Sequence, residues 1–148
     1  MVSEADNRKD LTTTIHLTAL RSVESSLARL LEDSGPELSE VLNQLPQDSA
    51  MLVSLIGPSK GARFLLDAER TSVGRASDNE IFLDDVTVSR KHAEIARREG
   101  KYSLKDLGSL NGTYLNGEIV NETFLKDGDE LQIGKFRMHF FSGGKVRS

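Results

Sequence analysis

The chain has 148 residues, no cysteine and a formal net charge of −4, with 19 Lys and Arg residues against 23 Asp and Glu residues. This length suits one domain with a tail, and the missing cysteine excludes a disulfide framework, a thiolate nucleophile and a cysteine-based zinc site. The first ten residues are charged, unlike a signal peptide, and no apolar run approaches the ~18 residues of a membrane span. We therefore expect a cytoplasmic protein with no membrane partner.

The charge is distributed unevenly along the chain. Residues 1–48 hold nine acidic and four basic residues, a net charge of −5, whereas residues 49–148 hold fourteen acidic and fifteen basic residues, a net charge of +1. A nucleic-acid-binding domain usually has a strong basic excess, so we expect no nucleic acid partner. The positive charge that stands out is local, at Arg75, Arg90 and Lys91, and it suits one small anion.

Residues 1–48 form the predicted N-terminal arm, which we expect to be partly helical or disordered. Its apolar residues recur mostly at steps of three or four, as on one face of a helix. They include Leu17, Leu20, Val23, Leu27 and Leu30. Gly35 and Pro36 would end this helix, and residues 38–45 favour a second short helix. The alternative is an acidic arm that stays disordered until it contacts a partner.

From residue 50 onward the apolar pattern becomes that of short β-strands. We predict strands at residues 51–56, 63–66, 71–73, 81–83, 93–98, 102–106, 113–115, 130–133 and 136–141. Turn pairs such as Asn116-Gly117 and Asp127-Gly128 separate them. Many short strands with turns every ~8–12 residues indicate an all-β antiparallel sandwich or barrel. We expect residues 49–142 to form this domain and residues 143–148 to form a C-terminal tail.

Several catalytic and cofactor chemistries are not supported by the sequence. It contains no glycine-rich nucleotide-binding pattern and no histidine paired at metal-ligand spacing, so we expect no cofactor and no metal. The acidic residues at 127–130 lack the periodicity of a calcium loop, and we expect a hairpin turn there. Asp85, Ser89 and His92 are the residue types of a hydrolase triad, but no nucleophile elbow surrounds the serine. We therefore expect no catalytic residue.

The loop at residues 84–92 lies between two predicted strands and carries a hydroxyl, a guanidinium and an imidazole. A phosphate monoester carries about −1.5 to −2 charges, and an arginine fork with hydroxyl and backbone donors is its best protein partner. Arg75, Ser89, Arg90 and Ser109 supply such groups on loops that one end of a sandwich would bring together. The sequence therefore predicts a phosphate-recognition site.

Three short motifs occur in a fixed order: Gly74-Arg75, then Ser89 to His92, then Asn111-Gly112. They resemble the G-R…S-x-x-H…N-G signature of forkhead-associated (FHA) domains, and the resemblance extends over about residues 50–141. It implies an eleven-stranded antiparallel FHA β-sandwich that binds phosphothreonine peptides through loops at one end and has no catalytic activity.

The resemblance also implies a role for individual residues. The phosphothreonine-binding set would be Arg75, Ser89, Arg90, Ser109 and Asn111. The loop-shaping set would be Gly74, His92 and Gly112. Within these sets, Arg75 and Ser89 would hold the phosphate, and Asn111 would bond the peptide backbone.

Residues 78–90, 108–114 and 128–137 more specifically resemble small actinobacterial FHA regulators, the family of the glycogen accumulation regulator and the oxoglutarate dehydrogenase inhibitor. In that family, a Ser/Thr protein kinase phosphorylates an arm with adjacent threonines, and the arm then occupies its own FHA pocket. The unphosphorylated regulators bind 2-oxoglutarate dehydrogenase or glutamate enzymes. The implied partners are therefore phosphothreonine-containing proteins, a Ser/Thr kinase and these enzymes.

The matching stretch of the arm contains three candidate phosphorylation sites. They are Thr12, Thr13 and Thr14. The flanking Leu11 and His16 depart from the acid and the aromatic residue of the family motif. FHA domains often prefer an apolar residue three positions after the phosphothreonine, which favours Thr12 and Thr14 over Thr13.

Three alternatives remain open beside a kinase-controlled phosphothreonine-binding regulator. The first is an inhibitor that docks on metabolic enzymes without any phosphate. The second is an FHA adaptor that oligomerises through the helical arm, with Leu20, Val23, Leu27 and Leu30 as the seam. The third is an enzyme whose turnover depends on Ser89 or His92, which the absence of a nucleophile elbow disfavours.

Overall fold

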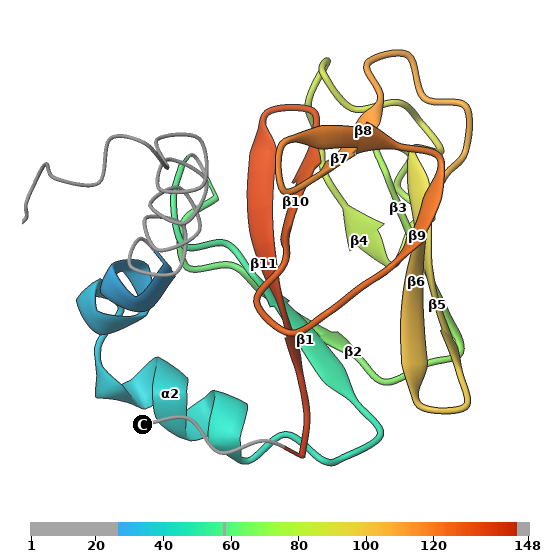
Figure 1. Cartoon of the computed structure of the whole chain (residues 1–148). Helices are drawn as coiled ribbons and strands as arrows, with labels where there is room; N and C mark the ends of the chain where they lie inside the picture. Colours follow the sequence, from blue (N-terminus) through green and yellow to red (C-terminus); the bar gives the residue numbers. More distant parts are fainter. Residues whose placement is uncertain (1–26, 58, 145–148) are drawn as a thin grey trace, which may run out of the picture. The chain divides into compact units, whose positions relative to one another are not determined.

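The computed structural model describes residues 27–57 and 59–144 (Figure 1). The chain divides into two compact units, Met1–Gly35 and Pro36–Ser148. In the first unit, residues 27–33 are helical, and the backbone N–H of Gly35 donates to the carbonyl of Glu32. Gly35 has a φ of 89°, a backbone conformation that commonly ends helices. The candidate phosphothreonines and the first part of the predicted arm helix lie outside the described residues.

The second unit contains eleven strands in two sheets, which confirms the predicted antiparallel FHA-type β-sandwich. The first sheet has the order β2-β1-β11-β10-β7-β8. Its strands are β1 (Ala50–Val53), β2 (Arg63–Leu66), β7 (Thr113–Leu115), β8 (Glu118–Val120), β10 (Glu130–Ile133) and β11 (Phe136–Ser142). The second sheet has the order β4-β3-β5-β6-β9. Its strands are β3 (Arg70–Gly74), β4 (Ile81–Phe82), β5 (Ala93–Arg98), β6 (Lys101–Asp106) and β9 (Glu122–Phe124).

Most neighbouring strands are antiparallel, while β3 and β4 pair in parallel. All nine strands predicted from the alternating pattern are present, although β1 ends at Val53. Beyond that point the chain turns, with Ser54 bonded to the backbone of Gly61 and Ala62. The two strands that the pattern does not predict are β8 and β9, each three residues long.

The core lies between the inward faces of the two sheets. It is built from alternate residues of the strands and from loop residues that cover the ends. Its members are Ala50, Leu52, Leu66, Val73, Ile81, Leu83, Val88, Ala93, Ile95, Tyr102, Leu104, Leu125, Leu131, Ile133, Met138 and Phe140. The ring of Tyr102 meets that of Phe140 edge to face at 5.3 Å, and its hydroxyl donates to the carbonyl of Leu66 at 2.9 Å. The loops at the ends of the sandwich are thus attached to a well-packed core.

Strands β1 and β11 are buried on their outer faces as well. Helix α2 (Pro36–Asn43), the predicted second short helix, belongs to the same compact unit and buries Leu38 and Leu42. Its Glu37 pairs with Arg63 of β2 at 3.9 Å. The chain after α2 is tied to the end of β11, because Gly144 donates its N–H to the carbonyl of Leu45. Neither described helix is long and apolar enough to cross a membrane.

Candidate functional site

Three connecting loops meet at the end of the sandwich drawn at the top of Figure 1, namely residues 75–80 after β3, 83–92 after β4 and 107–112 after β6. The backbone N–H of Leu110 donates to the hydroxyl of Ser89 at 3.0 Å. The backbone N–H of Arg75 donates to the carbonyl of Ser89 at 2.9 Å. Direct hydrogen bonds therefore join the loop that carries Ser89 to the other two loops.

Three successive carbonyls in the middle loop hold Arg75 and Asn111: two accept from their side chains and the third from the backbone of Arg75. The amide Nδ2 of Asn111 donates to the carbonyl of Thr87, and Nε of Arg75 donates to the carbonyl of Val88, both at 3.0 Å. The carbonyl of Ser89 accepts the backbone N–H of Arg75. Among the described residues, the side chain of Arg75 bonds through Nε alone, which leaves the two terminal nitrogens of its fork for an anion. Both Arg75 and Asn111 are exposed.

His92 lies beneath these loops and is completely buried. Its Nδ1 accepts the backbone N–H of Ser89 at 3.0 Å, and its Nε2 lies 2.9 Å from the carbonyl of Gly112. An imidazole nitrogen that accepts an N–H carries no hydrogen, so Nε2 is the protonated nitrogen and donates to Gly112. His92 thus connects two loops through one neutral ring.

The hydroxyls of Ser89 and Ser109 have different surroundings. Ser89 Oγ accepts the N–H of Leu110, and no described residue accepts its own hydrogen, which is left for a ligand. Ser109 Oγ donates to the carboxylate of Asp106 at 2.5 Å and accepts the N–H of Gly112 at 3.0 Å. The hydroxyl hydrogen of Ser109 is therefore used inside the loop. This side chain lies near the end of the sandwich and stabilises the turn there.

Asp106 organises the loop after β6, a role that the sequence did not predict. Its carboxylate accepts four hydrogen bonds, from the backbone of Gly108 and Ser109 and from the hydroxyls of Ser109 and Thr113. Burial raises the pKa of Asp106, but the hydrogen bonds from Ser109 and Thr113 outweigh it, so the pKa lies below its usual value. The carboxylate is therefore ionised at neutral pH and holds Ser109 in place.

Gly74 and Asn79 bring the end of β3 close to the loop at Arg90. The side-chain amide of Asn79 donates to the carbonyls of Ala76 and Arg90, at 2.8 and 2.9 Å. A Cβ on Gly74 would collide with the carbonyl oxygen of Arg90 and with Nδ2 of Asn79. Only glycine allows this approach of the two backbones. Asn79 was missed because an asparagine in a turn is ordinary.

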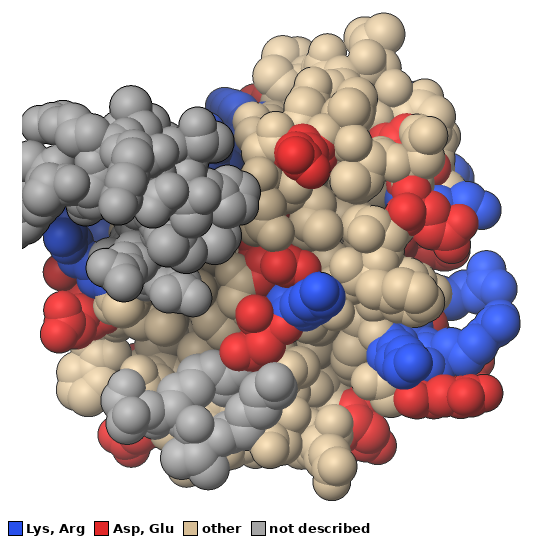
Figure 2. Space-filling model, in the orientation of Figure 1, with Lys and Arg blue, Asp and Glu red and all other residues tan. Residues whose placement is uncertain are grey.

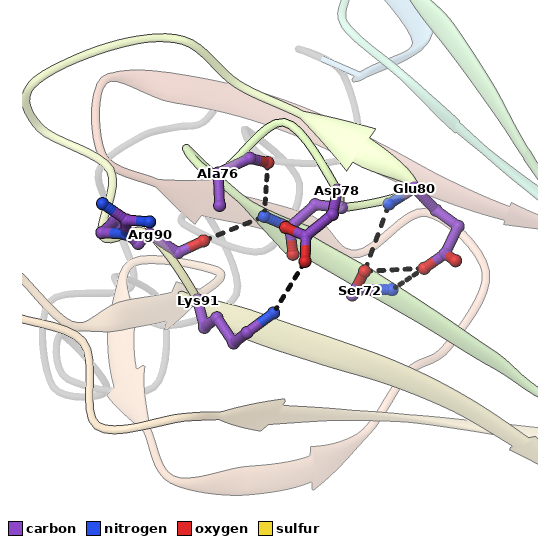
Figure 3. Close-up of polar contacts among 7 residues, drawn as sticks. Ser72, Ala76, Asp78, Glu80, Arg90 and Lys91 are labelled. Carbon is purple, nitrogen blue, oxygen red and sulfur yellow. Dashed lines mark hydrogen bonds and ion pairs between the residues drawn. The ribbon is translucent and has the colours of Figure 1, made fainter.

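The same turn is supported by two contacts on its outer side (Figure 3). The carboxylate of Glu80 accepts the backbone N–H and the hydroxyl of Ser72, at 2.9 and 2.6 Å, and these bonds lower the pKa of Glu80. Lys91 pairs with Asp78 at 3.6 Å across an exposed surface. Arg90 is itself exposed, so its guanidinium stands at the surface beside the tip.

The alternative chemistries find no matching arrangement in the described part of the chain. His92 bonds backbone groups and not the hydroxyl of Ser89, and the carboxylate of Asp85 bonds Thr87 and Lys135, so these three residues do not form a triad. Within residues 27–57 and 59–144, no cluster of His, Asp and Glu side chains is suited to a metal ion. At residues 127–130 the carboxylate of Asp129 accepts the N–H of Lys126 and closes a turn.

Apolar side chains surround the tip, and the sequence analysis did not identify them. Val86 and Leu110 are 89% and 88% exposed on the two loops that carry Ser89 and Asn111. Ile119 is also exposed, and its side chain lies against Gly112.

On the face drawn in Figure 2, Lys and Arg side chains are interspersed with Asp and Glu side chains, and a group of Lys and Arg side chains lies at the right over β5 and β6. Such mixed charge does not resemble a polyanion-binding surface.

Comparisons with known proteins agree with this geometry. The sequence profile of the FHA domain matches residues 71–134. A solved structure from a study of phosphothreonine-dependent FHA domain interactions is 32% identical and superposes with a TM-score of 0.58, covering 63% of this chain and 95% of the other. Together with the two-sheet fold and the tip loops, these matches define the class: the chain belongs to the family of FHA-domain proteins.

Within that family the chain is similar to small regulators. It is 46% identical over 134 residues to the oxoglutarate dehydrogenase inhibitor of Corynebacterium glutamicum, a match that covers 90% of each chain. It is 56% identical over 101 residues to the glycogen accumulation regulator GarA of Mycolicibacterium smegmatis, covering 68% of this chain and 64% of the relative. The predicted resemblance to small actinobacterial FHA regulators is confirmed.

Proposed function

We propose that this protein is a regulator that binds phosphothreonine peptides at its tip loops. The observation that carries the proposal is the arrangement around Ser89, whose hydroxyl hydrogen is available and whose carbonyl anchors Arg75. A phosphate needs an arginine fork and neutral donors at short range, and Arg75, Ser89 and Arg90 supply them. Asn111 would hold the peptide backbone with the part of its amide that Thr87 does not use.

Ser109 has a supporting role in this proposal. Its hydroxyl is committed to Asp106, so its contribution to a phosphate would come from how it shapes the loop. Gly74, His92 and Gly112 are the loop-shaping residues: Gly74 by admitting the carbonyl of Arg90, and His92 and Gly112 through their mutual bond. The exposed Val86 and Leu110 would contact apolar peptide side chains beside the phosphothreonine.

Residues 49–142 would form the binding domain, with α2 packed in the same unit and the arm as its regulatory segment. Thr13 lies 36 residues before Ser49. These 36 residues are not one flexible tether, because residues 27–33 and α2 within them are helical. A flexible stretch from Thr13 to residue 27 would have an end-to-end distance of about 19–22 Å. Millimolar effective concentrations are typical of short flexible linkers, so a phosphorylated arm of modest affinity would occupy the tip of its own chain.

Titrating peptides of residues 5–20 into the protein tests the proposal, with three singly phosphorylated forms and the plain form. We expect the plain peptide not to bind. Phospho-Thr12 and phospho-Thr14 should bind more tightly than phospho-Thr13, because apolar Ile15 and Leu17 follow them at the third position. Equal weak binding of all four peptides would refute phosphothreonine recognition. Clear preference for phospho-Thr13 would refute the proposed selectivity.

A second function is favoured by the similarity to proteins named oxoglutarate dehydrogenase inhibitor. In this proposal the unphosphorylated protein binds 2-oxoglutarate dehydrogenase or a glutamate enzyme, and phosphorylation by a Ser/Thr kinase releases it. Binding alone accounts for both functions, and no catalytic step is proposed. Adding the plain and the phosphorylated protein to a purified dehydrogenase complex tests the idea: inhibition by the plain form alone supports it, and equal effects of both forms refute it.

A further inference from the structure

The turn between β10 and β11 is bonded to the loop that carries Ser89. The hydroxyl of Thr87 accepts the backbone N–H of Lys135 at 3.0 Å. Gly134 has a φ of 60°, and a Cβ at that position would collide with Oγ1 and the carbonyl oxygen of Thr87. The chain thus places a glycine where the backbone of the turn must touch Thr87. The partners are 48 residues apart in the sequence.

An ion pair with a largely buried carboxylate strengthens this contact between the turn and the loop. Nζ of Lys135 lies 2.8 Å from one oxygen of Asp85, whose side chain is only 14% exposed. The other oxygen of Asp85 accepts the N–H of Thr87 at 2.9 Å and its hydroxyl at 2.5 Å. Both oxygens are therefore used, and Thr87 Oγ1 acts as donor to Asp85 and acceptor from the turn. We call Asp85, Thr87, Gly134 and Lys135 the clasp.

The clasp holds the backbone at Thr87, where the segment that orients Arg75 and Asn111 begins. The carbonyl of Thr87 holds the amide of Asn111, and the next carbonyl, of Val88, holds Nε of Arg75. A rotation of the backbone at Thr87 would move both acceptors. Small displacements of positioned groups are costly where several contacts to one ligand must form together.

We propose that the clasp is a positioning device for phosphopeptide recognition: Asp85, Thr87 and Lys135 act through the backbone at residues 87–89 to set the directions of Arg75 and Asn111. This inference rests on the proposed function, since it concerns the same site. The clasp residues need not touch the ligand. Their effect should appear as lost affinity in a protein that is still folded.

The experiment uses the full chain and the phospho-Thr12 peptide of residues 5–20, with affinity measured well below the unfolding temperature of each variant. Thr87→Val keeps the shape of the side chain but removes both hydroxyl bonds, and we expect it to weaken binding about tenfold or more. Thr87→Ser keeps the hydroxyl and should restore most of the affinity. Equal weakening by Val and Ser would indicate packing alone and overturn the proposal.

The ion pair is tested separately, because removing Lys135 also removes a positive charge that attracts the peptide. Lys135→Met should weaken binding, while Lys135→Arg keeps both the positive charge and a donor for Asp85 and should retain most of the affinity. Arg70→Met is the matched control. It breaks the 3.7 Å pair of Arg70 with Glu94 on the second sheet and removes the same charge. Equal weakening by Lys135→Met, Lys135→Arg and Arg70→Met would overturn the role of the ion pair.

A measurement on the unbound protein separates failure of the clasp from failure of the proposed function. The NMR signals of the Arg75 Nε–H and the Asn111 side-chain amide report their hydrogen bonds directly. We expect both signals to shift in Thr87→Val and to stay in place in Arg70→Met. Unchanged signals would overturn the clasp even if the peptide binds, whereas shifted signals in a protein that binds no phosphopeptide would refute the proposed function alone.

Discussion

The backbone N–H of Ser89 donates to Nδ1 of His92 at 3.0 Å, and this contact fixes the tautomer of a fully buried imidazole. The ring hydrogen therefore lies on Nε2, which donates to the carbonyl of Gly112 at 2.9 Å. One side chain thus joins the loop of the candidate phosphate site to the loop of Asn111.

His92→Leu should lower the free energy of unfolding by about 2–6 kcal/mol, because a partly buried N–H and a partly buried carbonyl each lose their partner at about 1–3 kcal/mol. Phosphopeptide affinity should fall as well, since the loops lose their connection. Urea unfolding measures the first effect and peptide titration the second. A loss of stability below about 0.5 kcal/mol would contradict this role.

His139 is a second buried histidine, and its replacement should cost less stability than the replacement of His92. It is 6% exposed, and its Nδ1 has no hydrogen-bond partner among the described residues. Burial lowers the pKa of His139, although Glu130 at 3.9 Å acts in the opposite direction. As the pH falls, His139 is protonated at a higher pH in the unfolded chain than in the folded protein. The folded state therefore has its full stability above about pH 6.5 and loses stability as the pH falls below that value. His139→Leu should therefore gain stability relative to the native protein between pH 7.5 and pH 5. Parallel stability curves would contradict the prediction.

Gly74→Ala should destabilise the protein by about 1–3 kcal/mol, the usual cost of overpacking, because its Cβ would meet the carbonyl of Arg90 and the amide of Asn79. Gly100→Ala is the control. An added Cβ there would meet open space, but its φ of 78° adds a backbone cost that Gly74 does not have, so the two variants are compared by affinity. Thermal unfolding and peptide affinity should both suffer in Gly74→Ala, while Gly100→Ala should leave the affinity unchanged. Native affinity in both variants would count against a close approach at Gly74.

Hydrogen bonding to Lys135 and Thr87 lowers the pKa of Asp85 to about 2. The carboxylate of the unfolded chain has a pKa near 3.9, so the stabilisation is fully present above about pH 4 and is lost as the pH falls toward 2. Asp85→Asn should therefore flatten the fall in stability over this range without abolishing it, because the pKa values of Glu80 and Asp106 are lowered too. Urea unfolding at several pH values measures the slope. An unchanged slope in Asp85→Asn would show that this carboxylate is not held by the clasp.

The sequence predicted the sandwich well where apolar residues alternate over four or more positions, as in β5 and β11. It missed β8 and β9, since three residues with few buried side chains carry little periodic signal. The motif residues were found through their fixed order, which reflects the backbone approach at Gly74 and the buried ring of His92. Asp106, Asn79 and the clasp could not be found in this way, because their roles depend on contacts between distant loops.

The central claim is that Arg75 and its loop partners form a phosphothreonine site. Titration of the phospho-Thr12 peptide into the native protein and into Arg75→Ala, with circular dichroism to establish that both are folded, tests it most directly. We predict saturable binding to the native protein and none to Arg75→Ala. Equal affinity of the two folded proteins for the phosphopeptide would contradict the claim and place recognition elsewhere on the molecule.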